Sequence, residues 1–70
     1  MRISEKIKQK RIENSISRNE VAKFMGITRQ TIAGWETDVN LPSAKYLVEL
    51  CLILNTDPNW LLGFEQREQK

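Results

Sequence analysis

Apolar residues recur at helical spacing in five segments of the chain, and turn-forming residues separate these segments. The first segment predicts a helix over residues 4–14. Its inward stripe runs from Ile3 through Ile7 and Arg11 to Asn14. Arg11 is the charged member of this stripe, and periodicity alone allows it to be a solvated charge at the stripe's edge.

The second segment begins with an S-x-x-E motif. The Ser17 hydroxyl accepts from a backbone N–H one turn later, and Glu20 reaches back to the Ser17 N–H, so this capping box predicts a helix start. Val21, Phe24 and Met25 follow at helical spacing and are expected on the core face.

A tight turn and a third helix come next. Gly26 can adopt a positive φ and end the preceding helix, and Thr28 is positioned to cap the helix that follows. Ile27 is expected to fill the turn, while Ile32 and Trp35 face back onto the second helix. Two short capped helices joined at a glycine predict a helix-turn-helix.

Two further helices are expected after a loop over residues 37–42, where Asp, Asn and Pro favour turns. Ser43 caps the fourth helix, whose core-facing positions are Leu47, Leu50, Cys51 and Leu54. Asp57 caps a short fifth helix, with Pro58 at its first position and Gly63 as its stop. The fourth helix is apolar on more than one side, which fits either a partner interface or packing on a neighbouring helix.

The exposed start of the third helix carries Arg29, Gln30, Thr31 and then Ala33. Arg can bind the O6 and N7 atoms of guanine, and Gln can bind N6 and N7 of adenine, in the major groove of DNA. A recognition helix contacts bases with its N-terminal residues. The alternative is a solvated polar face on a generic helical hairpin, but the ordered set of caps, glycine and apolar anchors favours a DNA-binding motif.

Residues 4–63 resemble the XRE-like helix-turn-helix family of phage-type repressors and Cro proteins. The matching positions are Arg11, Val21, Ala22, Gly26, Ile32, Trp35, Glu36, Pro42, Leu47, Leu50, Leu54, Trp60, Leu61, Leu62 and Gly63. The resemblance implies an all-α, five-helix repressor-like domain, with the helix-turn-helix formed by helices 2 and 3, that binds operator DNA as a symmetric dimer. It also implies an ion pair between Arg11 and Glu36.

The expected contacts fall into three sets. Arg29, Gln30 and Ala33 are predicted to contact bases. Phosphate contacts are predicted for Arg18, Thr28, Thr31, Asn40, Ser43 and Lys45. A homodimer interface is predicted at Leu52, Ile53, Asn59 and Trp60, although Trp60 also suits the core.

Charge is distributed unevenly along the 70 residues, whose net charge is +2. Residues 1–30 contain eight Lys and Arg against three Asp and Glu, whereas residues 31–70 contain three against six. The basic half holds the first two helices and the start of the third, where DNA phosphates are expected. Lys6, Lys8 and Lys10 are predicted to form a mostly solvated basic face, with phosphate attraction as the alternative.

Length and residue types limit the remaining possibilities. The chain is expected to form one DNA-binding domain over residues 1–64, followed by a polar tail over 65–70 that is either a natural end or a cut linker. No histidine, carboxylate cluster or glycine-rich phosphate loop is present, so we expect no enzyme activity, cofactor or metal site.

The single cysteine, Cys51, cannot form an intramolecular disulfide and is expected to be buried in a cytoplasmic protein. No apolar run is long enough to span a membrane, and the first residues lack the apolar stretch of a signal peptide. The expected partner is double-stranded DNA. The alternative is an antitoxin-type DNA-binding protein that also holds a partner toxin.

Overall fold

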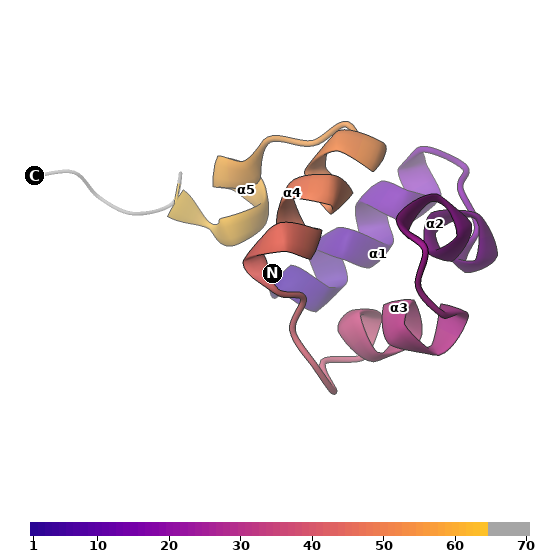
Figure 1. Ribbon diagram of the computed structural model, residues 1–70. Coiled ribbons are helices and arrows are strands. Elements are labelled where there is room, and N and C mark those ends of the chain that lie inside the picture. The colour runs from indigo at the N-terminus through magenta and orange to yellow at the C-terminus, as the bar shows by residue number, and fades with distance from the viewer. Residues whose placement is uncertain (65–70) are drawn as a thin grey trace, which may run out of the picture.

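A computed structural model describes residues 1–64, across which the chain forms five α-helices and no β-strand. The helices are α1 (Ile3–Glu13), α2 (Arg18–Met25), α3 (Arg29–Glu36), α4 (Ala44–Ile53) and α5 (Pro58–Leu62) (Figure 1). All five predicted helices are therefore present, and the all-α fold class is confirmed. The predicted tail, 65–70, lies outside the described residues.

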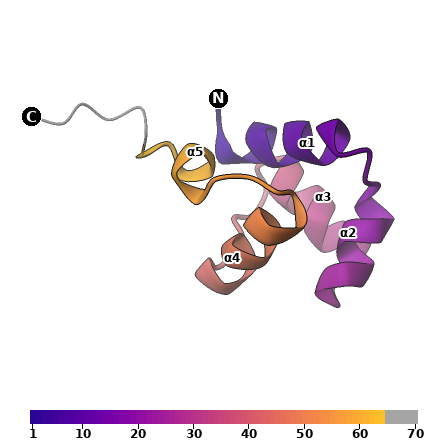
Figure 2. The same ribbon diagram turned by 90° about the horizontal axis from the view of Figure 1, so that it is seen from above.

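Helix α1 runs along one side of the domain, with α5 beside its N-terminal half and α2 near its C-terminal end (Figure 2). Helix α3 packs against both α1 and α2, and α4 packs against α2 and α5. Between them lies a core made of Ile7, Val21, Ala22, Ile32, Trp35, Leu50, Cys51, Leu54 and Leu61. This core contains residues of all five helices, so removing any one helix exposes part of it.

Side-chain caps begin four of the helices at the predicted residues. The hydroxyls of Ser17, Thr28 and Ser43 and the carboxylate of Asp57 each accept from a backbone N–H in the following turn. Gly26 and Gly63 end α2 and α5 with φ of 69° and 82°, in the left-handed region where a side chain would be strained.

Lys6 is not solvated, so its assignment to an exposed basic face was wrong. Its residue exposure is only 2%, and its Nζ donates to the Trp60 backbone oxygen at 2.5 Å. The same ammonium lies 4.9 Å from the centre of the Trp60 ring, and the Lys10 ammonium lies 5.0 Å from it. A lysine can cover apolar surface with its stem and place its charge on an aromatic face. Together Lys6 and Lys10 therefore attach α5 to α1.

Phe24 was also misplaced by the prediction, because its side chain is 68% exposed. The core face of α2 is centred on Val21 and Ala22, which are 1% and 5% exposed. At about 100° per residue, Phe24 lies about 160° around the helix from Ala22. It therefore points past the edge of the core rather than into it.

Cys51 is buried in α4, as expected, and is a free thiol. Burial raises the pKa of this thiol, and the nearby negative charge of Asp57 raises it further. None of the helices in residues 1–64 combines the length and the apolar character that crossing a bilayer requires.

Replacing Lys6 by alanine should destabilise the fold by about 1 to 3 kcal/mol, because it removes the buried stem and one of the two donors to the Trp60 carbonyl oxygen, the other being the Gly63 N–H. Lys8→Ala is the matched control, since Lys8 is an exposed lysine on the same helix. Its expected cost is below about 0.5 kcal/mol. Urea unfolding of both variants measures the difference, and equal midpoints would contradict the assigned role of Lys6.

Candidate nucleic-acid interface

The α2–turn–α3 unit is held in place by local hydrogen bonds. Ser17 Oγ accepts from the Glu20 N–H at 3.1 Å, and the Ser17 N–H donates to Glu20 Oε1 at 2.8 Å. After the Gly26 turn, the Thr28 hydroxyl accepts from the Thr31 N–H at 3.2 Å and starts α3. The sequence of caps and turn predicted for a helix-turn-helix is thus present.

The outward face of α3 is polar and open at its N-terminal end. Arg29 and Gln30 are exposed, and neither side chain forms a hydrogen bond or ion pair within residues 1–64. Ala33 is half-buried on the same face, while Ile32 and Trp35 on the opposite face are buried in the core. The predicted base-contacting residues therefore lie together, with their polar atoms free for a ligand.

A buried carboxylate joins three helices behind this face. Glu36 of α3 has a side chain with 0% exposure, and Arg11 of α1 donates to both its oxygens, from Nε at 2.6 Å and from Nη2 at 3.1 Å. Arg18 of α2 donates from Nε to the same carboxylate at 3.0 Å. The structure thus contains the Arg11–Glu36 pair that the family resemblance implies, with Arg18 as a third member.

The two arginines use their donors differently. Arg11 also donates from Nη1 to the Ile16 carbonyl oxygen at 3.0 Å, so all its nitrogens are engaged within the protein. Arg18 engages only Nε, and within the described residues both of its terminal amino groups lack a protein acceptor. The Arg18 side chain is also more exposed than that of Arg11, at 26% against 12%. Arg18 can therefore hold Glu36 and bind an external anion at once.

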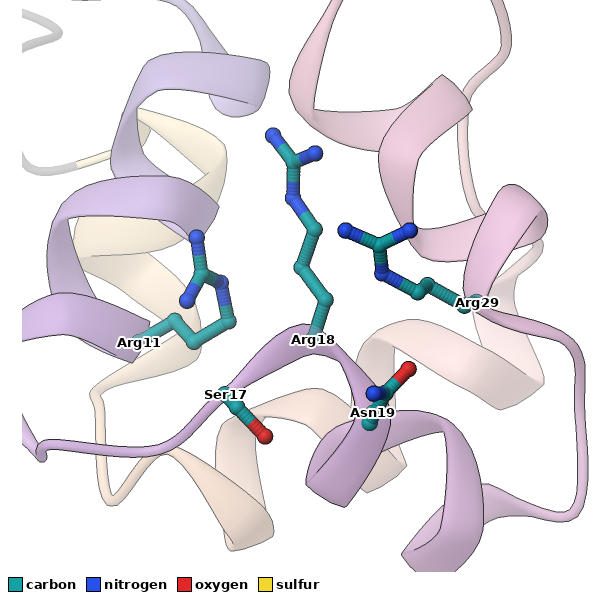
Figure 3. Close-up of a pocket in the computed structure, with 5 residues that line it drawn as sticks. All are labelled: Arg11, Ser17, Arg18, Asn19 and Arg29. Atoms are coloured by element: carbon teal, nitrogen blue, oxygen red, sulfur yellow. The ribbon is translucent and has the colours of Figure 1, made fainter.

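An open pocket of about 330 Å³ lies at this point, lined by Arg11, Ser17, Arg18, Asn19 and Arg29. The Arg18 side chain rises from α2 between those of Arg11 and Arg29, and the Arg29 side chain extends from α3 toward it (Figure 3). Three guanidinium groups against the single carboxylate of Glu36 leave the pocket positively charged. The N-terminus of α2 adds the backbone N–H groups of Arg18 and Asn19, which have no acceptor inside the helix. This arrangement suits an anion such as a phosphate group.

The remaining predicted phosphate-contacting residues lie around α3 and the start of α4. The Thr28 and Thr31 hydroxyls lie 2.9 Å apart and bond to each other. Ser43 Oγ caps α4 by accepting from the Tyr46 N–H at 3.5 Å, and the exposed Lys45 places its ammonium 5.7 Å from the centre of the Tyr46 ring. Asn40 is exposed in the loop between α3 and α4, away from the arginine pocket.

The predicted dimer residues separate into two groups. Leu52 is 77% exposed, and Asn59 is also exposed, so both are available to a partner. Ile53 is half-buried, and Trp60 is covered by Lys6 and Lys10. Val48 belongs to the apolar surplus of the fourth helix but was not named among the dimer residues, yet it is 62% exposed and lies one turn from Leu52. The four-residue spacing of two apolar side chains outside the core stripe was the available signal.

Sequence reasoning also missed Asn19 and the pairing of Arg2 with Asp38. Asn19 follows the cap by two residues, a position at which side chains surround the helix N-terminus, so its place in the pocket was predictable. Arg2 Nη1 lies 2.7 Å from Asp38 Oδ2, across 36 residues of chain, and no local pattern signals that contact. Residues 1–64 contain no group of three or more His, Cys, Asp or Glu side chains that could hold a metal ion.

Comparisons with known proteins agree with this geometry. A family model described as helix-turn-helix matches residues 7–61. The ImmF control region 10 kDa protein of Bacillus phage phi105 is 36% identical over 55 residues, which cover 79% of this chain. The same alignment spans 61% of that relative's own length.

Similar folds occur among solved structures of regulators. The biofilm master regulator SinR in complex with DNA has a TM-score of 0.78 and 28% identity, over 86% of this chain and 97% of that chain. SinR in complex with SinI has a TM-score of 0.78 and 26% identity, over 96% of this chain and 68% of that chain. The P22 c2 repressor bound to a synthetic operator has a TM-score of 0.81 and 24% identity, over 87% and 92% of the two chains. The last likeness bears on the fold alone, and it confirms the predicted repressor-like architecture.

The three-helix ion cluster predicts an order of stability among single variants. Glu36→Leu should cost about 3 to 5 kcal/mol, because it leaves two guanidinium groups without their carboxylate. Arg11→Met should cost less, since Arg18 still neutralises Glu36. The double change should cost less than the sum of the two single changes.

Urea unfolding of the three variants measures these differences. Arg29→Met is the control, because Arg29 has no partner within the described residues, and we expect it to lie within about 0.5 kcal/mol of the parent. If Glu36→Leu were as stable as this control, the buried cluster would not support the fold.

Proposed function

Because this chain belongs to the helix-turn-helix family, of XRE type, we propose that it is a transcriptional repressor that binds a palindromic operator through the major groove. One observation carries the proposal: the unpaired Arg29 and Gln30 lie at the open end of α3, where Arg29 also lines a pocket with Arg11 and Arg18. Residues 1–64 would act as the DNA-binding domain. The expected site of action is the cytoplasm.

Base reading is assigned to the N-terminal half of α3. Arg29 would bind O6 and N7 of a guanine, and Gln30 would bind N6 and N7 of an adenine. The methyl group of Ala33 would contact a thymine methyl. These assignments are supported by the exposure of Arg29 and Gln30 and by the absence of competing partners for their side chains within residues 1–64.

Phosphate binding is assigned first to the arginine pocket. With Nε held by Glu36, Arg18 would direct its terminal amino groups to a backbone phosphate, supported by the N-terminus of α2. Thr28, Thr31, Ser43 and Lys45 would add contacts on either side of α3. Such contacts set the register of the protein on DNA without specifying the sequence.

Two copies are expected on each operator, because one recognition helix contacts too few base pairs to specify a single site in a genome. The exposed apolar pair Val48 and Leu52 on α4, with Ile53 and Asn59, would form the two-fold interface. Trp60 would support this surface from behind through its contacts with Lys6 and Lys10.

A second function, holding a partner protein while bound to DNA, is favoured by one observation. One similar solved structure is SinR in complex with another protein, SinI. An antitoxin-type role would use the apolar surface of α4 for a toxin in place of, or alongside, a second copy. A toxin reading frame adjacent to this gene would favour that role.

If Arg29 contacts a base and Arg18 contacts a phosphate, replacing each by alanine should affect DNA binding differently. Arg29→Ala should cost about 1 to 3 kcal/mol per half-site on the operator and relax one preferred base, most simply a guanine. Arg18→Ala should weaken operator and scrambled DNA alike and lower the salt slope by about 0.9 per lost phosphate contact.

Titrations of both DNA sequences at several salt concentrations test this, after circular dichroism has established that Arg18→Ala is folded. The operator itself comes from selection out of a random DNA pool. Equal losses on both sequences for Arg29→Ala would mean that Arg29 contacts phosphate and not a base. Selection of no sequence by the parent protein would contradict sequence-specific DNA binding.

The assembly predicts that binding depends on the spacing of two half-sites. Their centres should lie about 34 Å apart, one turn of DNA, and insertion of five base pairs should abolish tight binding by placing the half-sites on opposite faces. Leu52→Lys should weaken binding to the paired site but leave an isolated half-site unaffected. Footprints confined to one half-site, with no effect of spacing, would rule out the symmetric dimer.

A further inference from the structure

The outward face of α3 has a gap one turn beyond Gln30, and a loop residue occupies it. Gly34 lies four residues after Gln30 and therefore on the same face of the helix. A Cβ atom placed on Gly34 would lie 3.2 Å from Nδ2 of Asn40. The amide of Asn40 thus lies against the position where a side chain at residue 34 would begin.

We propose that Asn40 is a base-reading residue that substitutes for the absent side chain of Gly34 in the major groove. This inference rests on the proposed DNA-binding function and adds a specificity determinant outside α3. It replaces the phosphate contact that the sequence alone suggested for Asn40.

Backbone hydrogen bonds anchor Asn40 to the recognition helix. The Val39 and Asn40 N–H groups both donate to the Gly34 carbonyl oxygen, at 3.0 and 3.3 Å. Asp38 adopts a positive φ of 68°, which turns the chain back over the end of α3, and its carboxylate pairs with Arg2 at 2.7 Å. The backbone at Asn40 is therefore held by α3 and, through Asp38, by Arg2 at the start of α1.

The chemistry of the amide favours a base over a phosphate. Within residues 1–64 the Asn40 side chain forms no hydrogen bond, so its NH2 donor and its oxygen acceptor are both available. An adenine presents the matching acceptor N7 and donor N6–H in the major groove, whereas a phosphate offers acceptors only. The loop over residues 37–43 contains no Lys or Arg, and its one Asp pairs with Arg2, so no residue of the loop beside Asn40 carries a positive charge that would draw a phosphate to it.

Base-by-base affinity profiles of Asn40→Ala test the proposal. The parent operator is selected first, and each base pair of a half-site is then changed in turn. In the variant we expect the preference at one position, an A·T pair, to fall by about tenfold or more, while the other preferences stay unchanged. Val39→Ala is the matched control, an exposed neighbour without a polar side chain, and its profile should equal that of the parent.

Gly34→Ala provides a second, independent variant that should not unfold the protein, because alanine favours the helix over glycine. Its Cβ would make a tight contact that the Asn40 amide can relieve only by shifting, so the preference at the same base pair should weaken. When Asn40 is already alanine, the change at Gly34 should have no further effect on that preference.

Three results would overturn the inference. An unchanged profile in Asn40→Ala, or a uniform loss on every sequence, would remove the base-reading role while leaving the DNA-binding function in place. If Asn40→Ala and Gly34→Ala weakened preferences at different base pairs, and the double variant lost both, Gly34→Ala would not be acting through the Asn40 amide. A parent protein that selects no sequence would instead overturn the proposed function itself.

Discussion

The arrangement of α1, α2 and α3, and with it the rest of the domain, depends on the buried carboxylate of Glu36. It lies fully buried at the end of α3 and receives hydrogen bonds from Arg11 of α1 and Arg18 of α2. A buried carboxylate needs compensating charge and hydrogen bonds, so these three helices can separate only by exposing or stranding charged groups. The orientation of α3 relative to α2 is therefore determined by an ion cluster as well as by apolar packing. The same cluster orients Arg18, whose free amino groups line the adjoining pocket.

Most of the secondary structure was predictable from the sequence because its signals are local. Ser17 and Glu20 lie three residues apart and cap their own helix, and Gly26 adopts the positive φ that a sharp turn needs. Lys6 and Phe24 were assigned incorrectly because their burial or exposure depends on contacts with other parts of the chain. Lysine burial depends on Trp60, which is 54 residues away, and helical spacing alone does not say where the edge of a small core lies.

The candidate site shows the same division. Exposure of Arg29 and Gln30 follows from the phase of α3, because Ile32 and Trp35 determine which face is buried. The sharing of Glu36 between two arginines, and the placement of Asn40 over Gly34, arise from contacts between separate elements. The spacing of apolar and polar residues along the sequence does not predict such contacts. The loop after α3 was therefore predicted to contact phosphate through Asn40, but not to bring the Asn40 amide against Gly34 of α3.

The cations around Trp60 respond to ionic strength differently from those that face the pocket. Lys6 binds a carbonyl oxygen and an aromatic ring, pairs with no carboxylate within residues 1–64, and is nearly inaccessible to solvent. Dissolved ions screen such a buried contact weakly, whereas they compete directly for the exposed groups that attract phosphate. Rising salt would accordingly detach the domain from a polyanion while α5 stays docked on α1. Release and unfolding are thus separable events in this small protein.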